Sequence, residues 1–228
     1  MAWFRRNKET ARQETDGIEA VREYLAATGA EQDEDVAADA VTSVPSDEYG
    51  PWDASEKSTD EGYLDFGALR IPAIEGIQIQ PDLGPDGKSV HGLNVVVGSS
   101  VVRLIVFSAP KSGDSWDELR AKTMAALTEQ KAKIRERKGR WGTEIHAVIA
   151  GHLPDGRAVT FNTRVFGVQG PRWILRGDIQ GPAASEEEAF KQVSQVIDQL
   201  VVFRDQSPYP PHTSLPLTIP QDLLDQLK

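Results

Sequence analysis

The period of the apolar pattern changes three times between residues 77 and 200, and the order of these changes limits the folds that the chain can adopt. Two stretches repeat apolar residues every three or four positions, from about residue 114 to 139 and from Ser185 onward, which predicts two helices. Six stretches have the alternation or β-rich composition of strands: 77–79, 90–97, 101–107, 141–153, 157–166 and 172–179. This order predicts an α+β domain over residues 61–206, with an antiparallel sheet and two main helices in a layered sandwich.

Turn chemistry predicts how the strands pair. Residues 98–100 suit a tight hairpin, and the run at 101–107 is apolar enough for an interior strand. Between 141–153 and 157–166, Pro154 presets φ and Gly156 accepts a positive φ. Counting back from this turn predicts which residues of the two strands pair. The predicted pairs are Ile149 with Phe161, Val148 with Asn162, Ala147 with Thr163, His146 with Arg164, and Ile145 with Val165.

The alternation that buries Ile145 and Ile149 turns a polar set to the opposite side. The candidate binding residues on that side are Glu144, His146, Asn162, Arg164, Arg176 and Asp178. Such a set could hold an anionic ligand or a peptide, and Glu144 with His146 could act as an acid–base pair. The alternative is a solvated face with weak ion pairs. Under a helix, Arg176 would pair with Asp178 or Glu144, whereas on an open face it is the best single ligand contact.

A basic run follows the first predicted helix stripe. Its candidate patch residues are Lys131, Lys133, Arg135, Arg137, Lys138 and Arg140. Three interpretations compete: contact with nucleic acid, docking of the chain's own acidic arm, or cations that are favourable at a helix C-terminus. The net charge of −10 opposes nucleic acid, so a nucleic-acid partner is not expected.

The charge is concentrated in an acidic arm. Residues 1–60 carry 6 basic and 15 acidic side chains, whereas residues 61–228 carry 19 and 20. The arm has few large apolar residues, which predicts that it is mostly disordered. It contains a possible short helix over 17–28, which either folds on a partner or on the chain's own body, or has no role. Residues 207–228 are expected to form a proline-rich strap and a short closing helix; a polyproline II motif that another domain binds is the alternative.

Several kinds of site are not expected. The chain has no cysteine, and the spacing of its four histidines fits no metal site. No catalytic residue is predicted, because no nucleophile stands at a recognisable spacing from a base. No glycine-rich loop forms a phosphate cradle, so no cofactor is predicted. No run reaches the ~20 apolar residues of a membrane span, and residues 1–8 do not resemble a secretory signal, so a cytoplasmic protein is expected. Nothing in the sequence specifies an oligomeric state.

Five ordered motifs carry a family resemblance: GPWD at 50–53, LDFGALRIP at 64–72, FSAPKSG at 107–113, GPRWILRG at 170–177 and PHTSLPLTIP at 211–220. Over about residues 50–220 the chain resembles the actinobacterial DUF3710 family, a domain of unknown function. The resemblance implies an actinobacterial cytoplasmic protein and supplies no reaction, cofactor or catalytic residue. The element order is also similar to the Mog1/PsbP-like sandwich, a class rich in non-enzymatic binding and accessory modules.

The function that we expect is that of a non-enzymatic interaction or accessory protein. It would bind a protein partner through the sheet face or through the acidic arm. The alternative is a small anionic-ligand-binding domain, or an enzyme, that uses the face of Glu144, His146, Arg164 and Arg176.

Overall fold

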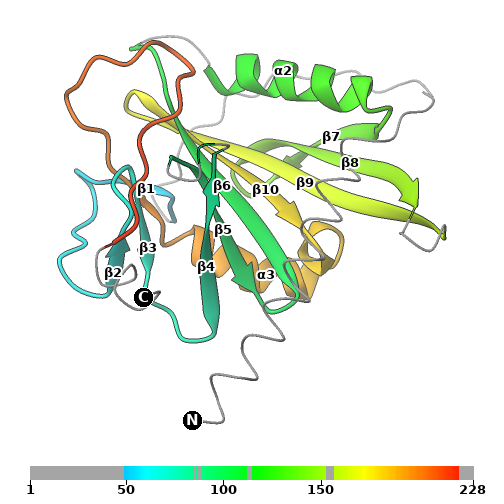
Figure 1. Ribbon diagram of the computed structural model, residues 1–228, viewed down its shortest axis with the longest axis horizontal. Helices are drawn as coiled ribbons and strands as arrows, with labels where there is room; N and C mark the ends of the chain where they lie inside the picture. The colour runs from blue at the N-terminus through cyan, green and yellow to red at the C-terminus, as the bar shows by residue number, and fades with distance from the viewer. Residues whose placement is uncertain (1–48, 85, 87–88, 112–114, 153–156, 221–228) are drawn as a thin grey trace.

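The computed structural model describes residues 49–84, 86, 89–111, 115–152 and 157–220, which form an α+β fold with two sheets (Figure 1). The seven-stranded sheet contains, in spatial order, β4 (Ile77–Leu83), β5 (Val90–Val97), β6 (Ser100–Ser108), β10 (Trp173–Gln180), β9 (Ala158–Gly170), β8 (Gly142–His152) and β7 (Lys133–Gly139). All of its neighbouring strands pair antiparallel, which confirms the predicted class. The four-stranded sheet contains β1 (Trp52–Asp53), β11 (Val201–Val202), β3 (Leu69–Pro72) and β2 (Tyr63–Asp65).

The two helices lie on opposite sides of the large sheet (Figure 1). Helix α2 (Ser115–Glu129) buries Trp116 and Leu119 against Ile145 and Ile174 of the sheet. The other side is covered by the 3₁₀ turn η1 (Pro182–Ala184), by α3 (Glu187–Ile197) and by the small sheet, which share the larger core cluster. Helix α3 is strongly amphipathic in sequence, whereas α2 has only a few apolar residues to bury, and each helix covers one apolar face of the sheet.

The predicted strand register is confirmed. Ile149 pairs with Phe161, Ala147 with Thr163, and the other predicted pairs between β8 and β9 also match. The hairpin between β5 and β6 forms at the expected turn, and β6 is an interior strand.

The first helix is shorter than predicted, and its expected last part is an edge strand. Helix α2 ends at Glu129, and Lys131 then adopts a positive φ of 55° as the chain reverses into β7. Ile134 reaches the apolar cluster under α2 as the helical spacing suggested, but it does so from β7. The interpretation of the basic run as helix C-terminal cations is therefore wrong.

Two other expected boundaries also differ. Residues 49–60 belong to the folded body, because β1 pairs with β11 and the amide N of Gly50 donates to Asp198 O at 3.0 Å. Helix α3 begins at Glu187 instead of at Ser185, because Ser185 is the C-cap of η1 and Glu186 is the N-cap of α3. The expected buried stripe of α3 is confirmed.

The proline-rich segment packs on the body as the predicted strap. Leu215 and Leu217 are buried, and the amide N of Leu215 donates to Val106 O at 2.8 Å. The expectations for residues 1–48, including the helix over 17–28, and for the closing helix at 221–228 lie outside the described residues.

Candidate functional site

The edge strand β7 presents a row of cations on the side of the sheet that faces away from α2. Ile134 packs toward α2, and Glu136 accepts a 2.6 Å hydrogen bond from Nε of Arg120 on that helix. Burial disfavours the charged form of Arg120, but its bonds to Glu136 and Asp117 outweigh this and raise its pKa. Because side chains alternate along a strand, the intervening cations point to the other side. These cations are Lys133, Arg135 and Arg137, and all three are exposed.

Two polar residues extend this row across the sheet. Arg135 pairs with His146, which in turn pairs with Arg164, and Lys133 lies in line with Val148 and Asn162. Directly opposed residues have Cβ atoms about 4.5–5.5 Å apart, so these side chains form one continuous surface. We call it the basic face, and it consists of Lys133, Arg135, Arg137, His146 and Asn162.

Among the described residues, no carboxylate binds the Lys and Arg side chains of the basic face directly, although the buried Glu144 lies opposite Arg137 on β8. Within the part of the chain that the structure describes, Lys133, Arg135 and Arg137 make no side-chain hydrogen bond or ion pair. His146 is 28 % exposed, and Asn162 is exposed on β9. From the sequence, the basic run and the polar strand face are two separate candidate sites. In the structure, β7 places them side by side on one surface.

Glu144 does not point into solvent as predicted, because it is completely buried. Its Oε2 accepts a 2.5 Å hydrogen bond from Nε of Arg164 and lies 3.5 Å from Nε2 of His146. The Arg164 guanidinium stands 3.4 Å from the ring centroid of Phe190 on α3, and the side chain is 12 % exposed. The strand alternation was right, but α3 reaches over this part of the sheet. Arg164 and Glu144 therefore form the inner border of the basic face.

Arg176 and Asp178 lie on the opposite side of the sheet from the basic face. Arg176 pairs in register with Gly167, and its Nη1 donates to Thr123 Oγ1 on α2 at 3.1 Å. Its Nε donates to Asp178 Oδ1 at 2.8 Å, which is one of the two pairings expected under a helix. The single predicted face with Glu144 and Arg176 together is therefore wrong.

The remaining cations of the predicted patch also separate from the basic face. Lys131 lies in the turn before β7, and Lys138 shares the α2 side with Glu136 by strand alternation.

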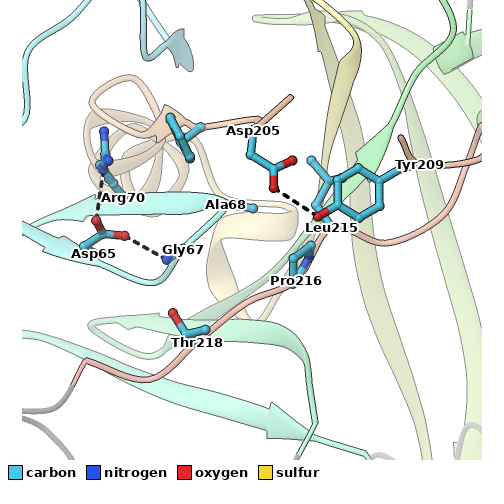
Figure 2. A pocket seen from close by; sticks show the side chains of 10 residues that line it. Asp65, Gly67, Ala68, Arg70, Asp205, Tyr209, Leu215, Pro216 and Thr218 are labelled. Atoms are coloured by element: carbon cyan, nitrogen blue, oxygen red, sulfur yellow. Dashed lines mark hydrogen bonds and ion pairs between the residues drawn. The ribbon is translucent and has the colours of Figure 1, made fainter. Parts of the chain in front are cut away.

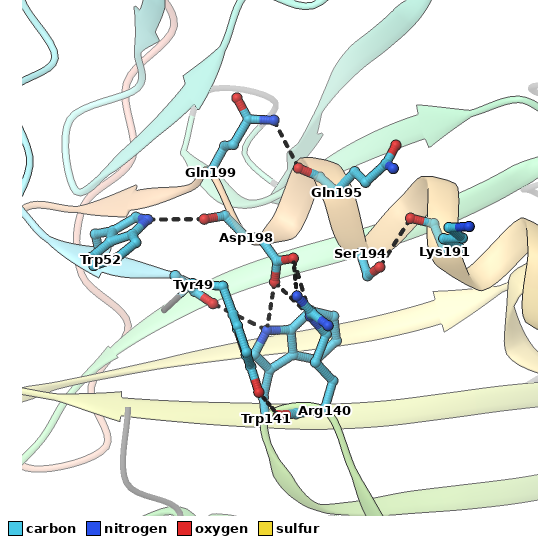
Figure 3. A network of polar contacts seen from close by, with 10 residues as sticks. Tyr49, Trp52, Arg140, Trp141, Lys191, Ser194, Gln195, Asp198 and Gln199 are labelled. Carbon is cyan, nitrogen blue, oxygen red and sulfur yellow. Dashed lines mark hydrogen bonds and ion pairs between the residues drawn. The ribbon is translucent and has the colours of Figure 1, made fainter. Parts of the chain in front are cut away.

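Arg140 is held in a separate polar network (Figure 3). Its Nη2 lies 2.7 Å from Asp198 Oδ2, and this hydrogen bonding raises the pKa of Arg140. The guanidinium stacks 3.8 Å from the ring centroid of Tyr49, whose hydroxyl donates to Arg140 O at 3.1 Å. Trp141 Nε1 donates to Gly50 O and to Asp198 Oδ1, so residues 49–50 are fixed beside the end of β7.

A pocket of about 210 Å³ lies elsewhere, between the small sheet and the strap (Figure 2). Arg70, Phe203 and Tyr209 contribute to its walls, and Tyr209 donates a hydrogen bond to Asp205 at 3.4 Å. Ligand pockets usually enclose about 300–1,000 Å³, so this one is smaller than a usual ligand pocket. None of the candidate residues lines it.

The described residues contain neither a candidate metal cluster nor a candidate membrane-spanning helix. No group of three or more potential metal ligands was found among them. None of the helices within those residues is long and apolar enough to cross a membrane.

The comparison with family models decides what the chain is related to. The model described as "Protein of unknown function (DUF3710)" matches residues 50–226, which is most of the chain. The chain belongs to the DUF3710 family. No curated protein matches it. Among solved structures, the solution structure of cyanobacterial PsbP (CyanoP) from Synechocystis sp. PCC 6803 is similar, with 11 % identity and a TM-score of 0.31. That match covers 64 % of this chain and 97 % of the other.

Proposed function

We propose that this DUF3710 chain is a non-enzymatic interaction protein of the actinobacterial cytoplasm, and that its basic face binds an acidic segment of a partner protein. The observation that carries the proposal is the row of Lys133, Arg135 and Arg137, which are exposed and lack ion-pair partners among the described residues. Carboxylates of a partner would supply the missing counter-charges, and arginine binds carboxylates in a specific two-pronged geometry.

The make-up of the face favours a polypeptide over a nucleic acid. Modules that bind single-stranded nucleic acids stack bases on aromatic side chains, and the basic face as defined contains no Phe, Tyr or Trp. β7 is also an edge strand of the large sheet, so its outer backbone groups are placed to pair with an extended peptide. Charges on an edge strand can alternatively serve only to prevent aggregation, and the following experiment distinguishes the two roles.

The test compares two triple variants of the full chain in pull-downs from an actinobacterial lysate. One variant reverses the charges of the face, Lys133→Glu with Arg135→Glu and Arg137→Glu. The matched control changes the net charge equally at exposed cations outside the face: Lys111→Glu, Arg172→Glu and Lys191→Glu. We expect the face variant to lose partners that the wild type and the control retain, and cross-linking to map the lost partner's contact to an acidic segment. Equal retention by both variants would overturn the proposal.

A further inference from the structure

We infer that residues 31–48 of the same chain bind the basic face in cis and compete there with the partner segment. The competition rests on the proposed function, whereas the intramolecular contact does not. Three properties of the chain support the contact: its charge, its point of attachment and the spacing of its acids.

The charges of the two surfaces are complementary. Residues 31–48 contain seven acidic residues and no basic one. The face offers three cations without partners among the described residues. Opposite charges near a protein surface attract over roughly one Debye length, about 8 Å at physiological salt, so the segment is drawn to this strand once it comes near.

The structure attaches the segment beside the basic face. Tyr49 is fixed on Arg140 by ring stacking at 3.8 Å and by a 3.1 Å hydrogen bond, and Arg140 directly follows β7 (Figure 3). At about 3.3 Å per residue, the seven residues of β7 span roughly 23 Å. The ten residues before Tyr49 can extend to about 33–36 Å. Residues 31–48 can therefore reach every cation of the face without any change in the body.

The spacing of the acids matches the spacing of the cations. Glu31, Asp33 and Asp35 occur at every second position, as do Lys133, Arg135 and Arg137. In extended chains both sets would repeat at about 6.6–6.8 Å, so each carboxylate could face one cation.

Tethering makes this contact effective against a partner. A short tether gives the attached segment an effective concentration at its binding site in the millimolar range. A partner segment competes with this effective concentration when it binds the face. The segment therefore sets a threshold for partner binding.

The test uses a spin label on the full chain. Because the chain has no cysteine, Ala30→Cys provides a single attachment site next to Glu31. We expect the label to cause loss of amide NMR signal on β7 and β8, and no such loss on β4 at the far edge of the sheet. The loss should disappear in the variant with Lys133, Arg135 and Arg137 changed to Glu, and at about 1 M salt, where the Debye length is about 3 Å.

Two controls make the result decisive. The variant with Lys111, Arg172 and Lys191 changed to Glu should keep the signal loss on β7. Replacement of the five acids of residues 31–39 by their amides should abolish it. The inference would be overturned if the signal loss persisted after charge reversal at Lys133, Arg135 and Arg137, or after neutralisation of these acids. Such a loss would reflect only the covalent connection between the label and the body.

The outcome is separable from that of the proposed function. If the label shows no contact while the face variant still loses its partners in pull-downs, only the inference fails. If the contact is present and no partner depends on the face, the proposed function fails and the face is an intramolecular site. If both hold, neutralising the acids of residues 31–39 should strengthen partner binding.

Discussion

Replacing Gly139 by alanine tests how the inner border of the basic face is built. A Cβ at residue 139 would lie 1.9 Å from both Cδ and Oε1 of Glu144, and contacts under 3.0 Å are essentially never seen. The carboxylate would have to move by about 1 Å, which disturbs the 2.5 Å hydrogen bond that Oε2 accepts from Arg164. Gly139 does not adopt the left-handed conformation, so the substitution adds a steric contact and no backbone strain there.

The expected magnitude combines two opposing effects. Removing one partner of a buried ion pair costs about 3–5 kcal/mol, which is an upper limit for a displacement that keeps both partners, and a Gly→Ala change at a compatible position returns about 0.4–1 kcal/mol by restricting the unfolded chain. Gly139→Ala should therefore lower the free energy of unfolding by no more than about 4–5 kcal/mol. For a fold of this size that corresponds to a decrease in Tm of no more than roughly 8–20 °C.

Urea denaturation followed by tryptophan fluorescence measures this change. The decisive comparison is a double-mutant cycle with Glu144→Ala. Once the carboxylate is gone, adding alanine at 139 should cost less than about 0.5 kcal/mol. An equal cost in both backgrounds, or no cost in the wild type, would refute the steric account of Glu144.

Three further predictions follow from the other polar contacts. Arg176→Ala should lower the Tm without reducing binding at the basic face, because it leaves Asp178, which is 13 % exposed, without its ion pair; loss of binding without loss of Tm would place Arg176 in the binding site. Asp198→Asn should destabilise the fold by about 1–3 kcal/mol in urea denaturation, since a neutral amide binds the Arg140 guanidinium less strongly; unchanged stability would show that this network is not structural. Hydrogen bonds from Ser207 lower the pKa of Asp205, so its stabilising contribution is present above its unfolded pKa and is lost as the pH falls below about 4. Asp205→Asn should remove that small part of the acid dependence of the Tm, and an identical pH profile would contradict the assignment.

The register of β8 and β9 could be predicted because two local signals agree on it. The turn signal at Pro154 and Gly156 determines which residues are counted as opposite one another. A shift of the strand pairing by one residue would turn Ile145 and Ile149 away from the core. The stripe of α3 was equally clear, since its apolar residues are numerous enough to define a helical period.

β7 was missed because its sequence contains too little apolar signal. Ile134 is its one large apolar residue, and it stands seven positions after Leu127, a spacing that also fits a helix. Pairing with β8, rather than local preference, makes this segment a strand. The alternation of Ile134 and Glu136 with cations was the one period-two signal available.

The candidate face was divided by two features that sequence alone does not specify. The turn between β9 and β10 is tight, with Arg172 at a φ of 65°, whereas the strands predicted at 157–166 and 172–179 leave five residues between them. The different turn length places Arg176 opposite Gly167, on the α2 side. The alternation also predicted the side on which Glu144 lies, but not that α3 would cover it.

The most direct measurement of the central claim is the binding of an acidic peptide to the basic face. A fluorescent peptide with the sequence of residues 31–48 is titrated, by anisotropy, with the full chain in which the acids of residues 31–39 have been changed to amides. We predict binding that weakens steeply from about 0.05 M to about 1 M salt. It should be lost when Lys133, Arg135 and Arg137 become Glu, and retained when Lys111, Arg172 and Lys191 do. Equal binding by the two triple variants, or no binding at low salt, would contradict the claim that this strand recognises acidic polypeptides.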